Sequence, residues 1–501
     1  MRARIPIFVP FFLSVLVSAW PVSAREFEVV VYNVENLFDA DGVSLFDDYA
    51  TPGYTHGHFA RKLEGVSAVM QRYGEGKGPD VILFQELEAD QTPEEGDAWL
   101  PTFLSRWSER SAGDWLRSGD ELPAAMASAP SHLWLAKQFV DDGLPPYEIA
   151  VSEYRPDPTG RDIAHVNAVF SRFPITRVRT HHTEGARGIL EATLDVGGHE
   201  LIVFVNHWKS GASNAETEPI RVGNARVLRN RLDEILRADP HADVIIGGDF
   251  NSQYNQKQRY PQMGATAIND VLRSQGDEYG LRQRRGPDLY NLWFELPEAQ
   301  RGSDVFRDEW GTLMQMIISR GLHDFRGVQY VDNTFTVGAF EGFNAHPGTR
   351  RPVRWQFADG GFGFSDHFPI SARFRTVENG DTRRWIELAR GHARANGPSR
   401  GVPVVVPAEH VQDVASLTEA GALLRAPNLG RHFRVSGVVS QTRPFKMRVD
   451  GSGAELTVWI HDRDARTRFY SRHAEGDRLE FVAELGQFRG EWQFVLSPDG
   501  L

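Results

Sequence analysis

The sequence of 501 residues contains no cysteine and, beyond its N-terminal region, no long apolar run. Without cysteine the chain forms no disulfide and no thiolate zinc site, and it is not a lipoprotein attached through an acylated cysteine. The internal apolar runs are short and interrupted by polar residues, so none of them predicts a transmembrane helix. We expect a globular protein of two or more cores, stabilised by packing alone.

The N-terminal region has the pattern of an export signal. Arg2 and Arg4 precede a mostly apolar run at 5–17, and residues 22–24 fit a small-residue cleavage site. Prolines interrupt the run, which is shorter than the roughly 20 residues that a membrane-spanning helix needs. We therefore expect residues 1–24 to be a removable signal peptide, and the mature protein to be periplasmic or extracellular without stable membrane insertion.

The chain also lacks an excess of positive charge, since its formal net charge is −12. This is unfavourable for the tight, salt-sensitive binding of nucleic acid that basic domains achieve. It does not exclude a nuclease, because carboxylates that hold a divalent cation make a site acidic when empty, and the bound cation reverses the local field.

Short β-rich runs alternate with helical or loop stretches from residue 26 to about 375, which predicts layered α/β structure. Residues 218–238 place apolar side chains on one face and predict an amphipathic helix. Residues 108–132 and 253–288 are richer in Gly, Pro and charge and predict long loops or insertions. The buried-strand candidates are Glu28–Tyr32, Val81–Phe84, Val166–Phe170, Leu201–Val205 and Val244–Ile246.

The C-terminal part has a different character. We expect a linker with helical segments at 377–427, because a charged helical stretch at 382–395 runs into Asn, Gly, Pro and Ser at 396–399. Beyond it, residues 428–501 resemble an OB-fold, a five-stranded barrel that often binds oligonucleotides. The five β-like runs are 433–441, 445–450, 455–461, 477–485 and 491–496.

Arginines and aromatic residues of this C-terminal part could supply cations and stacking surfaces for single strands. A module of this kind could also bind saccharide or only brace the first domain, with its aromatic residues in the core. The candidates for nucleic-acid contact are Arg434, Arg443, Lys446, Arg448, Arg466, Arg468, Arg472, Phe445, Trp459, Phe469, Tyr470 and Trp492.

Five separated segments each end an apolar run with residues suited to phosphate and metal chemistry. Each alone is common as a turn or capping residue, and only the combination is informative. The segments are VYNVENLFD with Asn33, ILFQELE with Glu86, FVNHWKS with His207, GGDFNS with Asp249 and Asn251, and SDHFPI with Asp366 and His367.

These residue types fit metal-assisted hydrolysis of a phosphodiester. Carboxylates such as Glu86 and Asp366 suit Mg²⁺ better than zinc, with Mn²⁺ or Ca²⁺ as alternatives. The reaction also needs a positioned water, a group that takes its proton, and donors for the phosphoryl oxygens. The five segments supply all of these.

The five blocks, in this order and at these separations, resemble the endonuclease/exonuclease/phosphatase superfamily over roughly residues 25–376. The resemblance implies a four-layer α/β sandwich of two packed β-sheets flanked by helices. It also implies that Glu86, Asn33 and Asp366 hold the metal. Asp249 and Asn251 would handle the attacking water and the phosphate, with His207 and His367 as the catalytic histidines. Arg187 and Lys209 are further candidates for phosphate binding.

One position departs from the family pattern. Residues 310–319 read WGTLMQMIIS, so Met314 stands where relatives carry the aspartate that orients the histidine of the final Asp-His pair. Met314 cannot accept that hydrogen bond with comparable strength. We expect a neighbouring group such as Asp324 to substitute for it, or His367 to titrate lower and be less firmly oriented than in relatives that keep the aspartate.

The motifs identify phosphoester hydrolysis more firmly than the substrate. The C-terminal domain favours nucleic acid, DNA or RNA or both. The alternative is a sphingomyelinase-like lipid phosphodiesterase or another phosphatase of the same fold. The lipid enzyme is less favoured, because no aromatic-rich apolar hairpin occurs between Gln253 and Trp310. A binding module without turnover is the third alternative, and protein partners and oligomeric state stay open.

Overall fold

The computed structural model describes residues 26–39, 41–92, 100–156, 163–282, 286, 288–324, 326–377, 401–417, 421–488 and 490–497, with the backbone only at 282. The predicted signal peptide and the helical stretch predicted at 382–395 lie outside these residues. Within the described part of the chain, no helix is long and apolar enough to cross a membrane.

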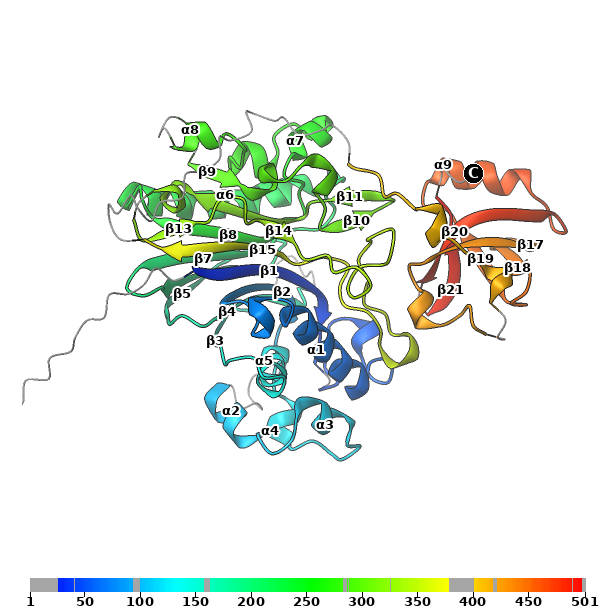
Figure 1. The fold of residues 1–501 in the computed structure, drawn as a ribbon, viewed down its shortest axis with the longest axis horizontal. Coiled ribbons are helices and arrows are strands. Elements are labelled where there is room, and N and C mark those ends of the chain that lie inside the picture. Colours follow the sequence, from blue (N-terminus) through cyan, green and yellow to red (C-terminus); the bar gives the residue numbers. More distant parts are fainter. Residues whose placement is uncertain are drawn as a thin grey trace, which may run out of the picture.

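Two β-sheets form the centre of the first domain (Figure 1). The first sheet has the order β13-β15-β1-β2-β4-β3, with β14 also on β15, and the second has the order β5-β6-β7-β8-β12-β9. The strands of the first sheet are β1 (Glu26–Leu37), β2 (Val81–Glu88), β3 (Glu148–Val151), β4 (His165–Ser171), β13 (Val328–Tyr330), β14 (Thr336–Val337) and β15 (Ile370–Thr376). Those of the second are β5 (Ile175–His181), β6 (Ile189–Asp195), β7 (Glu200–His207), β8 (Asp243–Asp249), β9 (Leu289–Asn291) and β12 (Met314–Ser319).

Helices cover the outer face of each sheet, so the domain has the four layers that the sequence predicts. One core lies between the first sheet and the helices α1 and α5, and another between the second sheet and α6. A third core fills the space between the sheets. The helices are α1 (His56–Met70), α2 (Leu100–Arg106), α3 (Ala112–Arg117), α4 (Ala124–Ala127), α5 (Ser131–Asp141), α6 (Glu218–Ala238), α7 (Gln256–Arg259) and α8 (Glu278–Arg282).

The two segments predicted to be long loops or insertions are partly helical, so the prediction of loops was wrong in detail. Residues 108–132 contain α3, α4 and the start of α5, and residues 253–288 contain α7, α8 and a π-helical turn at Ala267–Val271. Most of these helices are only one or two turns long. A periodicity of 3.6 residues cannot show in such short segments, and the Gly and Pro residues between them dominate the composition.

Strand alternation decides which side chains face the space between the sheets. In β1, Val29 and Val31 belong to the core between the sheets, whereas Val30 faces the helices. Asn33 has the same parity as Val29 and Val31, so it points toward the second sheet. In β8, Asp249 has the parity of Ile245, which also lies in the core between the sheets. The fold therefore directs Asn33 and Asp249 toward each other.

The C-terminal part is a closed barrel of five strands, as the sequence predicts. The order is β17-β18-β19-β21-β20, and β20 also pairs with β17 to close the barrel. The helix α9 (Arg463–Arg472) connects β19 to β20 (Figure 1). The strands are β17 (His432–Thr442), β18 (Phe445–Val449), β19 (Glu455–Trp459), β20 (Arg478–Phe488) and β21 (Glu491–Val495), with the short β16 (Gln412–Asp413) beside β17.

Several aromatic residues that the sequence offered for stacking are used inside this barrel. Phe445 is buried in the barrel core, and Phe469, Tyr470 and Trp492 pack partly against that core. Trp459 is covered by the guanidinium of Arg466, whose central carbon lies 4.2 Å from the ring centre. Stacking surfaces for a ligand therefore have to come from other residues.

Gly248, directly before Asp249, is required by the close approach of β7 and β8. Gly248 has φ of +145°, and a Cβ built there would lie 2.0 Å from the carbonyl oxygen of Asn206. We expect Gly248→Ala to lower the free energy of unfolding by about 2–4 kcal/mol, measured by denaturant titration. Gly223→Ala is the matched control: Gly223 lies in α6 with nothing within 4 Å of the added Cβ, and it should stabilise by about 0.5–1 kcal/mol. An equal effect of both variants would contradict the steric argument.

Candidate active site

The candidate site forms where β1, β2, β7 and β8 end. β1 is parallel to β2 and β7 is parallel to β8, so the carboxyl ends of each pair lie at one edge of their sheet. Asn33, His207 and Asp249 reach the edge by strand alternation. Glu86 reaches it differently: the β2 register is interrupted between Phe84 and Leu87, and Glu86 has a positive φ of 65°. Such a conformation is costly in a non-glycine residue and is typical of functional sites.

Asn33 holds the two central carboxylates together. Its Nδ2 donates to Oε1 of Glu86 at 2.9 Å and to Oδ2 of Asp249 at 3.1 Å. The second oxygen of Glu86 accepts from the backbone N–H of Asn36 at 3.0 Å. In this orientation Asn33 positions the carboxylates by donating to both of them, and its own Oδ1 accepts from the backbone N–H of Glu35.

Glu86, His207 and Asp249 form the group that could hold a metal ion. One ligand atom from each lies within 4.8 Å of the others. Nε2 of His207 is 3.7 Å from Oε1 of Glu86 and 3.7 Å from Oδ2 of Asp249. Two carboxylates suit a hard divalent cation, and the chain has no thiolate that would select zinc. The sequence-predicted ligand Asp366 is not in this group of three, but it lies close enough to raise the pKa of Glu86.

The carboxyl group of Glu86 is buried and lies near a second carboxylate, and both conditions affect its pKa. Burial and the negative charge of Asp366 raise its pKa to about 7, although the Asn33 hydrogen bond, Arg187 and His367 act in the opposite direction. A bound cation would favour the carboxylate form, because its charge offsets both burial and the repulsion. Metal binding and deprotonation of Glu86 should therefore be coupled.

His367 is a second histidine beside Asp249. Its Nε2 is 3.7 Å from Oδ2 of Asp249 and 3.7 Å from Oδ1 of Asp366, and its backbone N–H donates to Ser365. Burial alone would lower its pKa, but the carboxylates of Asp366, Asp249 and Asp304 outweigh burial and raise the pKa to about 9. The imidazolium is the form at neutral pH, so the ring can donate to a phosphoryl oxygen.

The position of the missing family carboxylate is occupied by Met314, and the expected substitute does not reach His367. Met314 is buried, and its backbone pairs with Asp249. The prediction of Asp324 as a substitute was wrong, because Asp324 is bonded to His241. The pKa of His367 lies above its ordinary value. Asp304 pairs with His367 through an isolated backbone β-bridge, and its charge helps to raise the pKa of the ring, after Asp366 and Asp249. Nδ1 of His367 has no hydrogen-bond partner among the described residues.

Arg187 lies in the site, as the sequence indicates. Its guanidinium donates to the carbonyl of Trp208 and contacts Nδ1 of His165 at 3.2 Å. Its Nε is buried and has no hydrogen-bond partner among the described residues. A buried donor without an acceptor costs free energy, and a phosphoryl oxygen would satisfy it.

Lys209 and Asn251 lie on the loops that follow β7 and β8. Lys209 is near enough to His207 to help lower the pKa of that ring, after burial, Arg187 and two histidines. Asn251 has a positive φ of 46°, and its backbone N–H donates to Oδ1 of Asp249 at 2.8 Å. Its Nδ2 donates to the carbonyl of Trp208. The loop geometry thus fixes Asp249 from a second side.

Sequence reasoning missed several residues of the site. His165 stacks on His207 at 6.0 Å and bonds to Oδ1 of Asn36. Glu35 binds Arg354, whose guanidinium lies 3.5 Å from Asp366. His165 begins a buried strand, and a polar residue at a strand end was a usable signal. Glu35 and Arg354 lie 319 residues apart, so only the fold brings them together.

Comparison with known proteins agrees with the resemblance. Residues 145–376 match the sequence model of the endonuclease/exonuclease/phosphatase family. Among solved structures, truncated TDP2 from Caenorhabditis elegans is 14% identical, covering 70% of this chain and 97% of that chain with a TM-score of 0.37. An endonuclease/exonuclease/phosphatase family protein from Bacteroides thetaiotaomicron is 13% identical, covering 73% and 99% with a TM-score of 0.39. The human Nocturnin catalytic domain with bound sulfate is 13% identical, covering 70% and 95% with a TM-score of 0.35.

None of the curated proteins matches the chain. The matched residues contain three of the five motif segments, those with His207, Asp249 and Asp366, and so support the resemblance to the endonuclease/exonuclease/phosphatase family. The Glu86, His207 and Asp249 group is a possible metal site, as expected for a metal-dependent hydrolase of this fold.

Proposed function

We propose that this chain is an exported, divalent-metal-dependent phosphodiesterase whose substrate is nucleic acid. The observation that carries the proposal is the group of Glu86, His207 and Asp249 ligand atoms within 4.8 Å, with the positive charges of Arg187 and His367 beside it. A cation bound there, with Mg²⁺ as the proposed ion, would polarise a phosphoryl oxygen and neutralise developing charge.

The protein residues have separate tasks in this proposal. Asp249, held by Asn33 and Asn251, orients the attacking water and accepts its proton. His367 and Arg187 donate to the phosphoryl oxygens, where negative charge accumulates in the transition state. His207 has a pKa well below its ordinary value, because of burial and nearby Arg187, so it is neutral and available as a ligand or acceptor.

Nucleic acid is the proposed substrate because the catalytic domain is joined to an OB-like barrel. Barrels of this type often bind oligonucleotides. We also propose that residues 1–24 direct export and are then removed, so protein recovered from the periplasm or medium should begin at Arg25.

The test is Glu86→Gln in the mature protein. The change removes one charged ligand and should weaken Mg²⁺ or Mn²⁺ affinity about 10- to 100-fold in calorimetry, with a parallel loss of hydrolysis at limiting metal. Substrates should include single-stranded DNA, duplex DNA, RNA and sphingomyelin.

The matched control is Glu295→Gln. Glu295 is also a buried carboxyl with a raised pKa, about 8, but it bonds to Tyr330 away from the site. It should leave metal affinity unchanged. Full turnover in chelator would refute metal dependence, and hydrolysis of sphingomyelin alone would replace nucleic acid by lipid as the substrate.

A further inference from the structure

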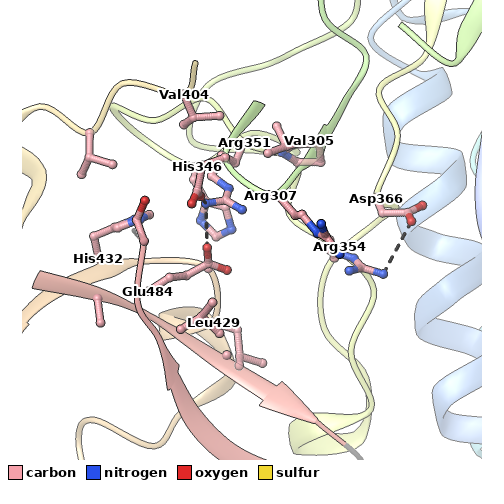
Figure 2. Close-up of a pocket in the computed structure, with 18 of the residues that line it drawn as sticks. Val305, Arg307, His346, Arg351, Arg354, Asp366, Val404, Leu429, His432 and Glu484 are labelled. Atoms are coloured by element: carbon pink, nitrogen blue, oxygen red, sulfur yellow. Dashed lines mark hydrogen bonds and ion pairs between the residues drawn. The ribbon is translucent and has the colours of Figure 1, made fainter. Parts of the chain in front are cut away.

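A cleft of about 680 Å³ separates the catalytic domain from the barrel (Figure 2). The catalytic domain contributes the hairpin of β10 (Asp304–Phe306) and β11 (Glu309–Gly311) and part of the 346–366 loop. The barrel contributes β20, β21 and the start of β17. The volume is in the range of about 300–1,000 Å³ that holds small ligands. Both domains therefore line a single binding-sized space.

One end of the cleft reaches the candidate active site. Asp366 lines it, and Arg354 points toward Asp366 in Figure 2, with 3.5 Å between the charged groups. The Arg354 side chain is 60% exposed although it pairs with Glu35 and Asp366. A molecule in the cleft would thus lie directly beside a phosphate held at the catalytic residues.

Exposed aromatic rings stand on both walls. Phe306 of the β10–β11 hairpin is 59% exposed, and Phe488 at the end of β20 is 62% exposed. Phe488 lies at the loop between the fourth and fifth barrel strands, which is one of the loops that OB-folds use for binding. Arg307 packs over the Phe306 ring at 5.0 Å, and it has no ion-pair partner among the described residues. The cleft thus combines two aromatic rings on which bases could stack with the positive charge of Arg307.

The walls are held together by a charged contact. Arg351 of the catalytic domain lies 3.0 Å from Asp308 and 2.7 Å from Glu484 of the barrel, which places the barrel against the hairpin (Figure 2). The backbone N–H of Ala426 also donates to Asp359 at 3.0 Å. Because these contacts fix the walls before a ligand arrives, binding would cost little ordering of the protein.

We propose that this cleft binds the part of a single nucleic-acid strand that adjoins the scissile phosphate, with bases stacked on Phe306 and Phe488 and a phosphate at Arg307. The proposal rests on the proposed function and names its substrate as unpaired nucleic acid. Unpaired bases can stack on aromatic side chains, whereas paired bases in a duplex cannot. His432 and His461 also line the cleft, and burial keeps both neutral by lowering their pKa. Most of the binding should therefore come from stacking.

The experiment measures binding of a fluorescein-labelled 15-residue oligothymidylate to the full mature chain in chelator, by fluorescence anisotropy. Catalysis is off under these conditions, so the result does not depend on the proposed hydrolysis. Phe306→Ala and Phe488→Ala should each raise Kd about 5-fold or more. Arg307→Gln should reduce the slope of log K against log salt by about 0.7.

The matched control is Tyr279→Ala, which removes a 71% exposed ring outside the cleft and should change Kd less than about 2-fold. Each variant should keep the wild-type hydrolysis of bis(p-nitrophenyl) phosphate, a diester without bases, and the wild-type melting temperature. Equal affinity for the single strand and for a duplex of the same length would overturn the proposal. So would no binding, or values of Kd for both phenylalanine variants within about 2-fold of wild type. If the wild-type protein did not hydrolyse this diester, that result would instead refute the proposed function.

Discussion

Asp249→Asn is expected to lower kcat about 1,000-fold with little change in KM. Asp249 contacts four of the candidate site residues: it accepts from Asn33 and Asn251 and lies 3.7 Å from the rings of both His207 and His367. Asparagine keeps the size of the side chain but removes its charge and its ability to accept a proton from water. The measurement is steady-state hydrolysis of a short oligonucleotide and of bis(p-nitrophenyl) phosphate.

The matched control is Asp243→Asn at the other end of the same strand. Asp243 is buried like Asp249, but its Oδ2 accepts from the backbone N–H of Val328 at 2.7 Å, away from the site. We expect this variant to change the free energy of unfolding and not kcat. An Asp249→Asn enzyme with wild-type kcat would remove Asp249 from the proton-transfer step, and an equal loss in both variants would mean that the loss follows from the fold.

The sequence was sufficient to predict the layers of the first domain, because each strand or long helix has a hydrophobic pattern within its own segment. Each of the five buried runs is part of a strand, and the amphipathic pattern at 218–238 coincides with α6. The turn glycines between the C-terminal runs likewise coincide with the strand ends of the barrel. Short helices such as α4 were missed, since four residues give no periodicity.

The site was less predictable than the layers, because part of it depends on pairing between distant strands. Asn33, Glu86, His207, Asp249 and His367 come together as the motifs indicated. The role of Asn33 as a donor to two carboxylates follows only from the parity of two strands in different sheets. The cleft beside the site follows from the docking of two domains, which no motif encodes.

The carboxylates Asp324 and Asp304 show the clearest difference between the sequence prediction and the structure around His367. Asp324 follows the predicted strand, which made it the natural candidate from the sequence. The strand is antiparallel to β8, however, so its far end lies at the start of β8, where Asp324 meets His241. Asp304 lies on the short strand β10, which no sequence pattern announced, and its Oδ1 accepts from the backbone N–H of Leu313 and from Ser303.

His367→Ala is expected to lower kcat about 100- to 1,000-fold, because the imidazolium that donates to the phosphoryl oxygen is lost. Asp304→Asn should act through the same ring and lower kcat about 10-fold. Asp304 is one of the carboxylates that raise the pKa of His367 to about 9, so its neutralisation should move that pKa downward. The measurement is an NMR titration of the histidine rings in chelator, beside kcat for each variant.

Two further variants distinguish the effect of Asp304 from that of a carboxylate at position 324 or 314. Asp324→Asn, the matched control, should leave both kcat and the His367 pKa unchanged, because Asp324 is bonded to His241. Met314→Asp should give no gain in kcat, since Asp366, Asp249 and Asp304 already keep the ring positively charged, and should lower stability by burying an unpaired charge at a fully buried position. If Met314→Asp instead raised kcat, or Asp304→Asn left the His367 titration in place, Asp304 would not be the carboxylate that positions and charges this histidine.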